Sequence, residues 1–224
     1  MDDAKFHSFA QRTLSGFRAS GKDSVTENPL LLRMIAEIEE EQLNQLELGA
    51  PEDKTVLTGP KRGLLAVYKK LVANKFRIYR EKLVGKRDSN ESALAAQYDA
   101  AVLEHHFYES YSLLALKVIL HQELITKLLE ESTLRKLEKS RGLMKDAQEG
   151  RLKHGFLDEH SGETPVFLHK TFAEFFAARF LAHKINSATS TDDVVYDVVA
   201  HMYGTEEYSG VLDFFEAMGT KSHS

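Results

Sequence analysis

The stretch VFLHKTFAEFFAARFLAHKI, residues 166–185, carries the strongest structural signals in this chain. Thr171 and Glu174 have the T-x-x-E spacing of a capping box, so a helix is predicted to begin sharply at this point. The phenylalanines that follow recur at three- and four-residue steps and predict a broad aromatic helix face packed in a core. They are Phe172, Phe175, Phe176 and Phe180.

Two short apolar pieces flank the turn-rich HSGET just before that helix, at residues 155–159 and 165–169. This pattern predicts a β-hairpin with about five residues in each strand. A hairpin that follows several helices is typical of a winged-helix module. Residues 91–186 are therefore predicted to form a winged-helix-like domain.

Most of the remaining chain has helical spacing, so the predicted fold class is mainly α. An N-terminal helix and linker, residues 1–27, precede a helical domain at residues 28–90, and residues 187–224 form C-terminal helices and a tail. In ENPLLLRMIAEIEEEQLNQL, Asn28 is a candidate N-cap and Pro29 occupies the first helical position, where no N–H is needed. A long helix is predicted over residues 64–83, and two or three more between residues 94 and 147.

Composition indicates a globular protein of 224 residues with a formal net charge of −5. The chain has no cysteine, which excludes disulfides and thiolate zinc sites. No apolar run reaches the length of about 18 residues that a membrane helix needs, and the acidic N-terminus lacks the layout of a signal peptide. We expect a cytoplasmic protein that has no membrane partner.

The stretch GFRASGKDS, residues 16–24, approaches the Walker A pattern of nucleotide-binding loops. Asp23 stands where a Ser or Thr should hold Mg²⁺, and the preceding residues have helical rather than strand spacing. We interpret this stretch as a polar linker. The chain also lacks G-x-S-x-G, H-E-x-x-H and a cysteine nucleophile, while the adjacent His105 and His106 would point apart on a helix. We therefore expect no catalytic residue, no metal site and no enzymatic activity.

Charge is segregated along the sequence. Residues 61–87 contain ten Lys or Arg and a single acid, Glu81. This pattern indicates either a solvated helix face or a surface for a polyanion or an acidic partner, and the candidate residues are Lys69, Lys70, Arg77 and Arg80. A winged-helix nucleic-acid-binding protein that uses this basic helix is the alternative function. The negative net charge argues against it, so nucleic acid is not an expected partner.

Two segments resemble the NACHT-type signalling NTPases of the STAND class, which include the animal NLR immune receptors. ENPLLLRMIAEI resembles the start of the helical domain that follows the nucleotide-binding core in that family. VFLHKTFAEFFAARFLA is similar to the family's winged-helix segment, F-x-H-x-[ST]-F-x-E-[FY]-x-A-A. The resemblance implies that Pro29 packs against the adenine of bound ADP and that His169 contacts its β-phosphate. The alternatives are a helix-start role for Pro29 and a backbone-bonded hairpin-end role for His169.

The family's Walker A and Walker B residues belong upstream of ENPLLL, so the resemblance implies that this chain lacks the nucleotide-binding core. We expect a fragment, truncated product or degenerate relative that binds no cofactor alone, with ADP or ATP bound in an intact parent protein. The predicted function is a non-catalytic regulatory or interaction module of a nucleotide-switch signalling protein of the innate-immune type. Its expected partner is an upstream nucleotide-binding core or another protein.

Overall fold

The computed structural model describes residues 33, 60–85, 100–138, 156–157, 166–187 and 193–219. The chain divides into two compact units, Met1–Ala73 and Asn74–Ser224. Pro29, the linker at residues 16–24 and the N-terminal helix lie outside the described residues. The predicted domain boundaries after residues 27, 90 and 186 stay predictions.

Helix α3 spans Pro60–Gly85 and contains the whole of the long helix predicted over residues 64–83, which confirms that helix. The boundary between the two units falls inside α3, after Ala73. In the first unit, α3 buries its apolar residues Leu65, Val67, Tyr68, Leu71 and Val72. In the second unit, Phe76 of α3 packs against Phe107 with ring centroids 5.3 Å apart.

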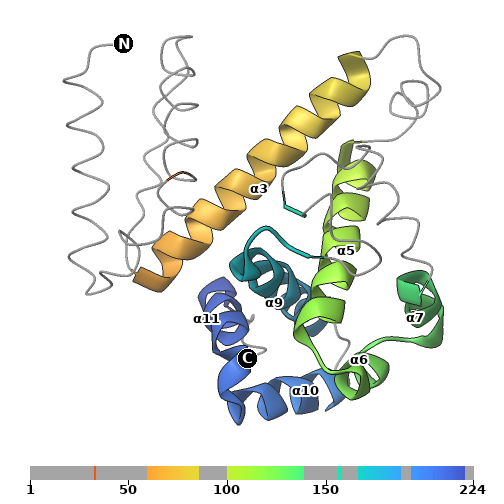
Figure 1. The fold of residues 1–224 in the computed structure, drawn as a ribbon, viewed down its shortest axis with the longest axis vertical. Helices are drawn as coiled ribbons and strands as arrows, with labels where there is room; N and C mark the ends of the chain where they lie inside the picture. Colours follow the sequence, from red (N-terminus) through yellow and green to blue (C-terminus); the bar gives the residue numbers. More distant parts are fainter. Residues whose placement is uncertain are drawn as a thin grey trace. The chain divides into compact units, whose positions relative to one another are not determined.

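The described residues of the second unit are almost all helical, which confirms a mainly α fold (Figure 1). Beyond α3 they form α5 (Ala100–Ile119), α6 (Gln122–Leu128), α7 (Glu131–Glu138), α9 (Lys170–Ser187), α10 (Asp193–Tyr203), the short 3₁₀ helix η2 (Glu206–Tyr208) and α11 (Ser209–Met218). Within the described ranges, none of the helices has both the length and the apolar character needed to cross a membrane.

Helix α9 lies at the centre of the second unit, with α5 packed on one side and α11 on the other (Figure 1). Residues 172–178 are buried without interruption, so α9 has no solvent-facing stripe over these two turns. Three of the seven are alanines, Ala173, Ala177 and Ala178, whose small side chains let neighbouring helices approach closely. A helix that is buried all round is typical of a core position rather than of the protein surface.

An aromatic cluster forms the core between α5 and α9. The ring of Phe176 stacks on Tyr111 with centroids 5.1 Å apart and an interplanar angle of 20°. Phe156 contacts both rings edge-to-face, at 5.3 Å from Tyr111 and 5.6 Å from Phe176. The predicted aromatic face is thus confirmed as core for Phe172, Phe175 and Phe176, while Phe180 is only half-buried.

The predicted β-hairpin at residues 155–169 is not supported. Among the described residues there is no strand, and the only pairing is an isolated antiparallel bridge between Leu157 and Phe167. The backbone N–H of Leu168 donates to the carbonyl of Phe156 at 2.9 Å beside this bridge. Phe156, Leu157 and Phe167 are all buried, so these apolar residues cover the aromatic cluster instead of alternating between two faces of a ribbon.

Candidate functional site

His169 lies in the short connection between the Leu157–Phe167 bridge and the first residue of α9. Its side chain is half-buried, and the neighbouring Val166 and Leu168 are 45% and 57% exposed. His169 is the described position that the sequence singled out for phosphate contact.

The imidazole of His169 caps α9. Its Nδ1 atom accepts a hydrogen bond from the backbone N–H of Thr171 at 3.3 Å and lies 2.7 Å from the Thr171 hydroxyl. The carbonyl of His169 accepts the N–H of Phe172 at 3.1 Å. These bonds place His169 at the N-cap position, where a side chain satisfies an otherwise unbonded N–H of the first turn.

The predicted capping box is therefore wrong in its residues, although a helix does begin here. Helix α9 begins at Lys170, one residue before Thr171. The Glu174 carboxylate, which a capping box would turn back to the backbone, instead lies 3.2 Å from the Lys170 ammonium. The physical reason is that a histidine at the N-cap position already accepts the N–H of Thr171.

The hydrogen bonds of His169 determine its neutral tautomer. A ring nitrogen that accepts the Thr171 N–H carries no proton of its own, so the proton of the neutral ring lies on Nε2. Within the described part of the chain, Nε2 has no hydrogen-bond partner. The ring thus offers one N–H donor beside the N-terminus of α9, where the helix dipole favours a negative charge.

Lys170 adds a positive charge at the same place. Its ammonium pairs with Glu174 Oε1 and lies 3.4 Å from the carbonyl oxygen of Glu207 in η2. The bond from Lys170 to the Glu207 carbonyl joins the first turn of α9 to the region just before α11. The Nε2–H donor beside the positive end of the helix dipole suits an anionic oxygen better than a cation.

The basic residues predicted on α3 lie on a different element from His169. Lys69 and Arg80 are exposed, and Lys70 is half-buried. Arg77 is exposed but pairs along the helix, at 2.7 Å from Glu81 and 2.9 Å from the Asn74 side-chain oxygen. The charge of this surface is therefore partly neutralised by its own helix.

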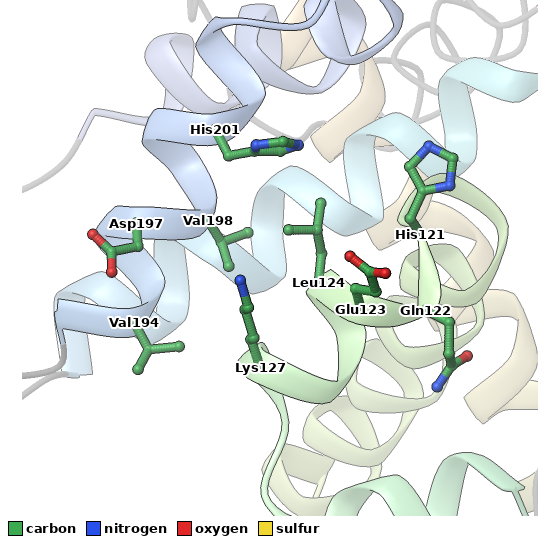
Figure 2. A pocket seen from close by; sticks show the side chains of 9 residues that line it. All are labelled: His121, Gln122, Glu123, Leu124, Lys127, Val194, Asp197, Val198 and His201. Atoms are coloured by element: carbon green, nitrogen blue, oxygen red, sulfur yellow. The ribbon is translucent and has the colours of Figure 1, made fainter.

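An open groove of about 760 Å³ lies between α6 and α10 (Figure 2). Apolar side chains of Leu124 and Val198 face each other across it, and His121 and His201 stand at its rim (Figure 2). His121 also lies 3.2 Å from the Glu207 carboxylate, and its ring packs edge-on against Tyr208. Burial and the neighbouring Glu207 raise the pKa of Tyr208. In the described part of the chain, no three His, Cys, Asp or Glu residues are grouped so as to hold a metal ion.

No protein-family model, curated protein or solved structure matches this chain. The resemblance to NACHT-type NTPases therefore remains a prediction that rests on the two sequence motifs. A bond from His169 to nearby backbone was the alternative that the sequence left open, and the Thr171 N–H supplies such a bond. The identity of His169 as the N-cap of α9 was not predicted. No sequence signal indicated the groove, because His121 and His201 are eighty residues apart in the sequence.

Proposed function

We propose that this chain is a non-catalytic regulatory module that packs over a nucleotide-binding core, with His169 in contact with an anionic oxygen of the bound nucleotide. The observation that carries the proposal is the capping bond from Thr171 N–H to His169 Nδ1, which leaves Nε2–H as the ring's donor. A neutral histidine at a helix N-terminus binds a phosphate oxygen without needing to be charged.

A winged-helix-like arrangement is part of this proposal. The antiparallel bridge between Leu157 and Phe167 brings the two ends of the connection together directly before α9. In the proposed arrangement, the exposed Val166 and Leu168 beside this bridge face the core. Apolar residues around a polar contact exclude water from it and so strengthen the hydrogen bond to the anion.

The proposed switch has two states that differ in contacts at His169. With a nucleoside diphosphate in the core, the Nε2–H bond adds to the packing energy and favours the closed state. When the anion is replaced or displaced, this bond is lost and the module is released. A hydrogen bond to a charged group contributes about 1.5–3 kcal/mol, which corresponds to roughly a 10- to 100-fold change in affinity.

Binding of the full chain to a purified P-loop core of NACHT type, loaded with ADP or with a non-hydrolysable ATP analogue, tests the proposal. We expect tighter binding to the ADP-loaded core, and a loss of roughly tenfold or more in that binding for His169→Ala. His183→Ala is the matched control, since His183 is an exposed histidine on the same helix. Equal affinity of the wild type and His169→Ala for the ADP-loaded core would remove the proposed role.

The second candidate function is nucleic-acid binding through α3, which the exposure of Lys69 and Arg80 favours. The burial of α9 argues against it, because residues 172–178 face other helices and cannot enter a DNA groove. Fluorescence anisotropy with a labelled DNA duplex separates the two functions. Binding that weakens steeply with salt and with Lys69→Glu would favour this candidate, and an absence of binding at low salt would exclude it.

A further inference from the structure

Helix α10 exposes apolar and aromatic side chains on the face opposite its core. Val195, Val198, Val199 and Met202 are buried. Of its exposed residues, Tyr196 (51%) and Tyr203 (56%) lie on one side of the helix, while Val194 (41%) lies on the opposite edge, beside the α6–α10 groove. Three of the seven exposed large hydrophobic residues of the described chain therefore lie on this one helix of 11 residues. A surface helix normally places polar residues there, so this face has the composition of an interaction surface.

The same region is strongly acidic. Residues 188–219 contain seven Asp or Glu and neither Lys nor Arg. Asp197 on α10 and Glu206 and Glu207 in η2 are exposed. Figure 2 shows the Asp197 carboxylate at the outer edge of the α6–α10 groove, directed away from the α6 side chains. A partner for this face should therefore combine positive charge with the ability to pack on tyrosine rings.

Helix α3 of the same sequence has those properties. Lys69, Ala73, Arg77 and Arg80 follow one another at steps of four, four and three residues, so they form one stripe along the helix, and all four are exposed. Arginine stacks readily on tyrosine, and this chain already contains such a contact, with the Arg179 guanidinium 3.6 Å from the centre of the Tyr108 ring.

We propose that the α10 surface, made of Tyr196, Asp197, Ala200 and Tyr203 together with Glu206 of the following η2, binds the α3 stripe of a second copy of this chain. Tyr196, Ala200 and Tyr203 share one side of α10, and Ala200 is exposed between the two tyrosines. Tyr196 and Tyr203 lie about 10.5 Å apart along α10, on either side of Ala200, and Lys69 and Arg77 lie about 12 Å apart along α3, on either side of Ala73. The two exposed alanines allow the helices to approach each other closely, with the Lys69 and Arg77 side chains over the tyrosine rings.

The contact joins two different surfaces, so it is heterologous. One copy uses its α10 surface and keeps its α3 stripe available, and the other copy does the reverse. Two single helices bury less area than a standard protein interface, and the association is therefore weak and salt-sensitive. This inference does not depend on the proposed nucleotide role, because it involves neither His169 nor Lys170.

Sedimentation velocity of the full chain over a range of concentrations and salt tests this proposal. We expect the sedimentation coefficient to rise with concentration at low salt and to stay at the monomer value at high salt. An acidic-face variant, Asp197→Lys with Glu206→Lys, and a basic-face variant, Lys69→Glu with Arg80→Glu, should each weaken association at least tenfold. Glu130→Lys, an exposed acid outside both surfaces, is the matched control and should associate like the wild type.

An equimolar mixture of the two variants is the decisive sample. In the mixture, the unaltered α3 stripe of one variant meets the unaltered α10 surface of the other, and the two reversed surfaces also fit each other in charge, so association should recover. Circular dichroism of each variant checks that its helices are intact, and Tyr196→Ser should weaken association without any change of charge. A wild-type chain that stays monomeric at all concentrations, or a mixture that does not recover association, would overturn the proposal.

Discussion

The carboxylate of Glu174 on α9 fills the space that a side chain at position 210 on α11 would occupy. A Cβ atom built on Gly210 would lie 2.5 Å from each of the two carboxylate oxygens. Glu174 is buried and paired with Lys170, so its side chain has little room to withdraw. Glycine at position 210 is therefore favoured because a larger residue would have to displace the Glu174 carboxylate. The backbone of Gly210 is helical, so its φ angle does not demand glycine.

Gly210→Ala is expected to destabilise the chain by about 1–3 kcal/mol, because the added methyl group overpacks the α9–α11 contact. Urea unfolding followed by circular dichroism measures this loss. Gly204→Ala is the matched control, since a Cβ at that exposed glycine would come no closer than 3.5 Å to the carbonyl oxygen of His201. Combining Gly210→Ala with Glu174→Ala should recover part of the loss, and purely additive effects would contradict this account.

Phe176→Ala should cost about 3–5 kcal/mol of unfolding free energy, as is usual when a fully buried phenylalanine is truncated. Phe176 contacts Tyr111, Phe156, Phe175 and Phe167, so its removal leaves a cavity at the centre of the aromatic cluster. Phe180→Ala on the same helix should cost clearly less, because Phe180 is half-buried. Equal losses of stability for the two variants would show that the cluster is not the core.

Stability should fall as the pH rises above about 10. Burial raises the pKa of Tyr111 far above its usual value, with the nearby Tyr79 adding to the shift. The folded chain therefore keeps this proton at a pH where the unfolded chain releases it. The stabilisation is complete below the unfolded pKa of about 10 and is lost above it, by up to about 1.4 kcal/mol per pH unit.

Urea unfolding midpoints measured at about pH 8, 10 and 11, on both sides of the usual tyrosine pKa of about 10, test this pH dependence of stability. The Tyr111→Phe variant has no ionisable group at this position, so its stability should decline less steeply with pH than that of the wild type. Tyr196→Phe is the control, because Tyr196 is exposed. Identical slopes for the wild type and Tyr111→Phe would rule out Tyr111 as the cause.

His169 should hold its proton on Nε2 when neutral. Long-range ¹H–¹⁵N correlation spectra of the histidine rings distinguish the two tautomers directly. Removing the Thr171 hydroxyl by Thr171→Val should weaken this preference while the backbone N–H remains as a donor to Nδ1. A neutral ring protonated on Nδ1 would be incompatible with the capping bond and with the role proposed for Nε2.

Helices α3 and α9 were predictable because their apolar residues recur with helical spacing over several turns. The burial of Phe172, Phe175 and Phe176 follows from the same spacing. It gathers the three aromatic rings on one part of the helix, and packing that part in the core removes all three from water. The hairpin was not predictable in this way. Short apolar pieces such as GFLDE and PVFLH have the same pattern whether they form strands or cover a core, and only contacts with α5 and α9 decide between these structures.

The N-cap of α9 and the partner of Glu174 could not be predicted from the sequence. Thr171 is a far commoner N-cap residue than His169, so local preference selected the wrong cap. Glu174 likewise matched a capping box, but its partner is Lys170 and its neighbour is Gly210, some 36 residues further along the chain. Contacts between distant segments of a chain leave no periodic pattern in its sequence, and the role of Gly210 could not have been read from it.

The position of α9 between α5 and α11 has a consequence for the order of events during synthesis. Both neighbours lie far from α9 along the chain, one before it and one after it. Until residues 209–218 have left the ribosome, the side of α9 that α11 covers keeps Phe175 exposed to solvent, because its partner Phe214 is not yet available. The nascent chain therefore passes through a stage in which the α11-facing side of α9 is uncovered, and exposed apolar surface of this kind favours aggregation.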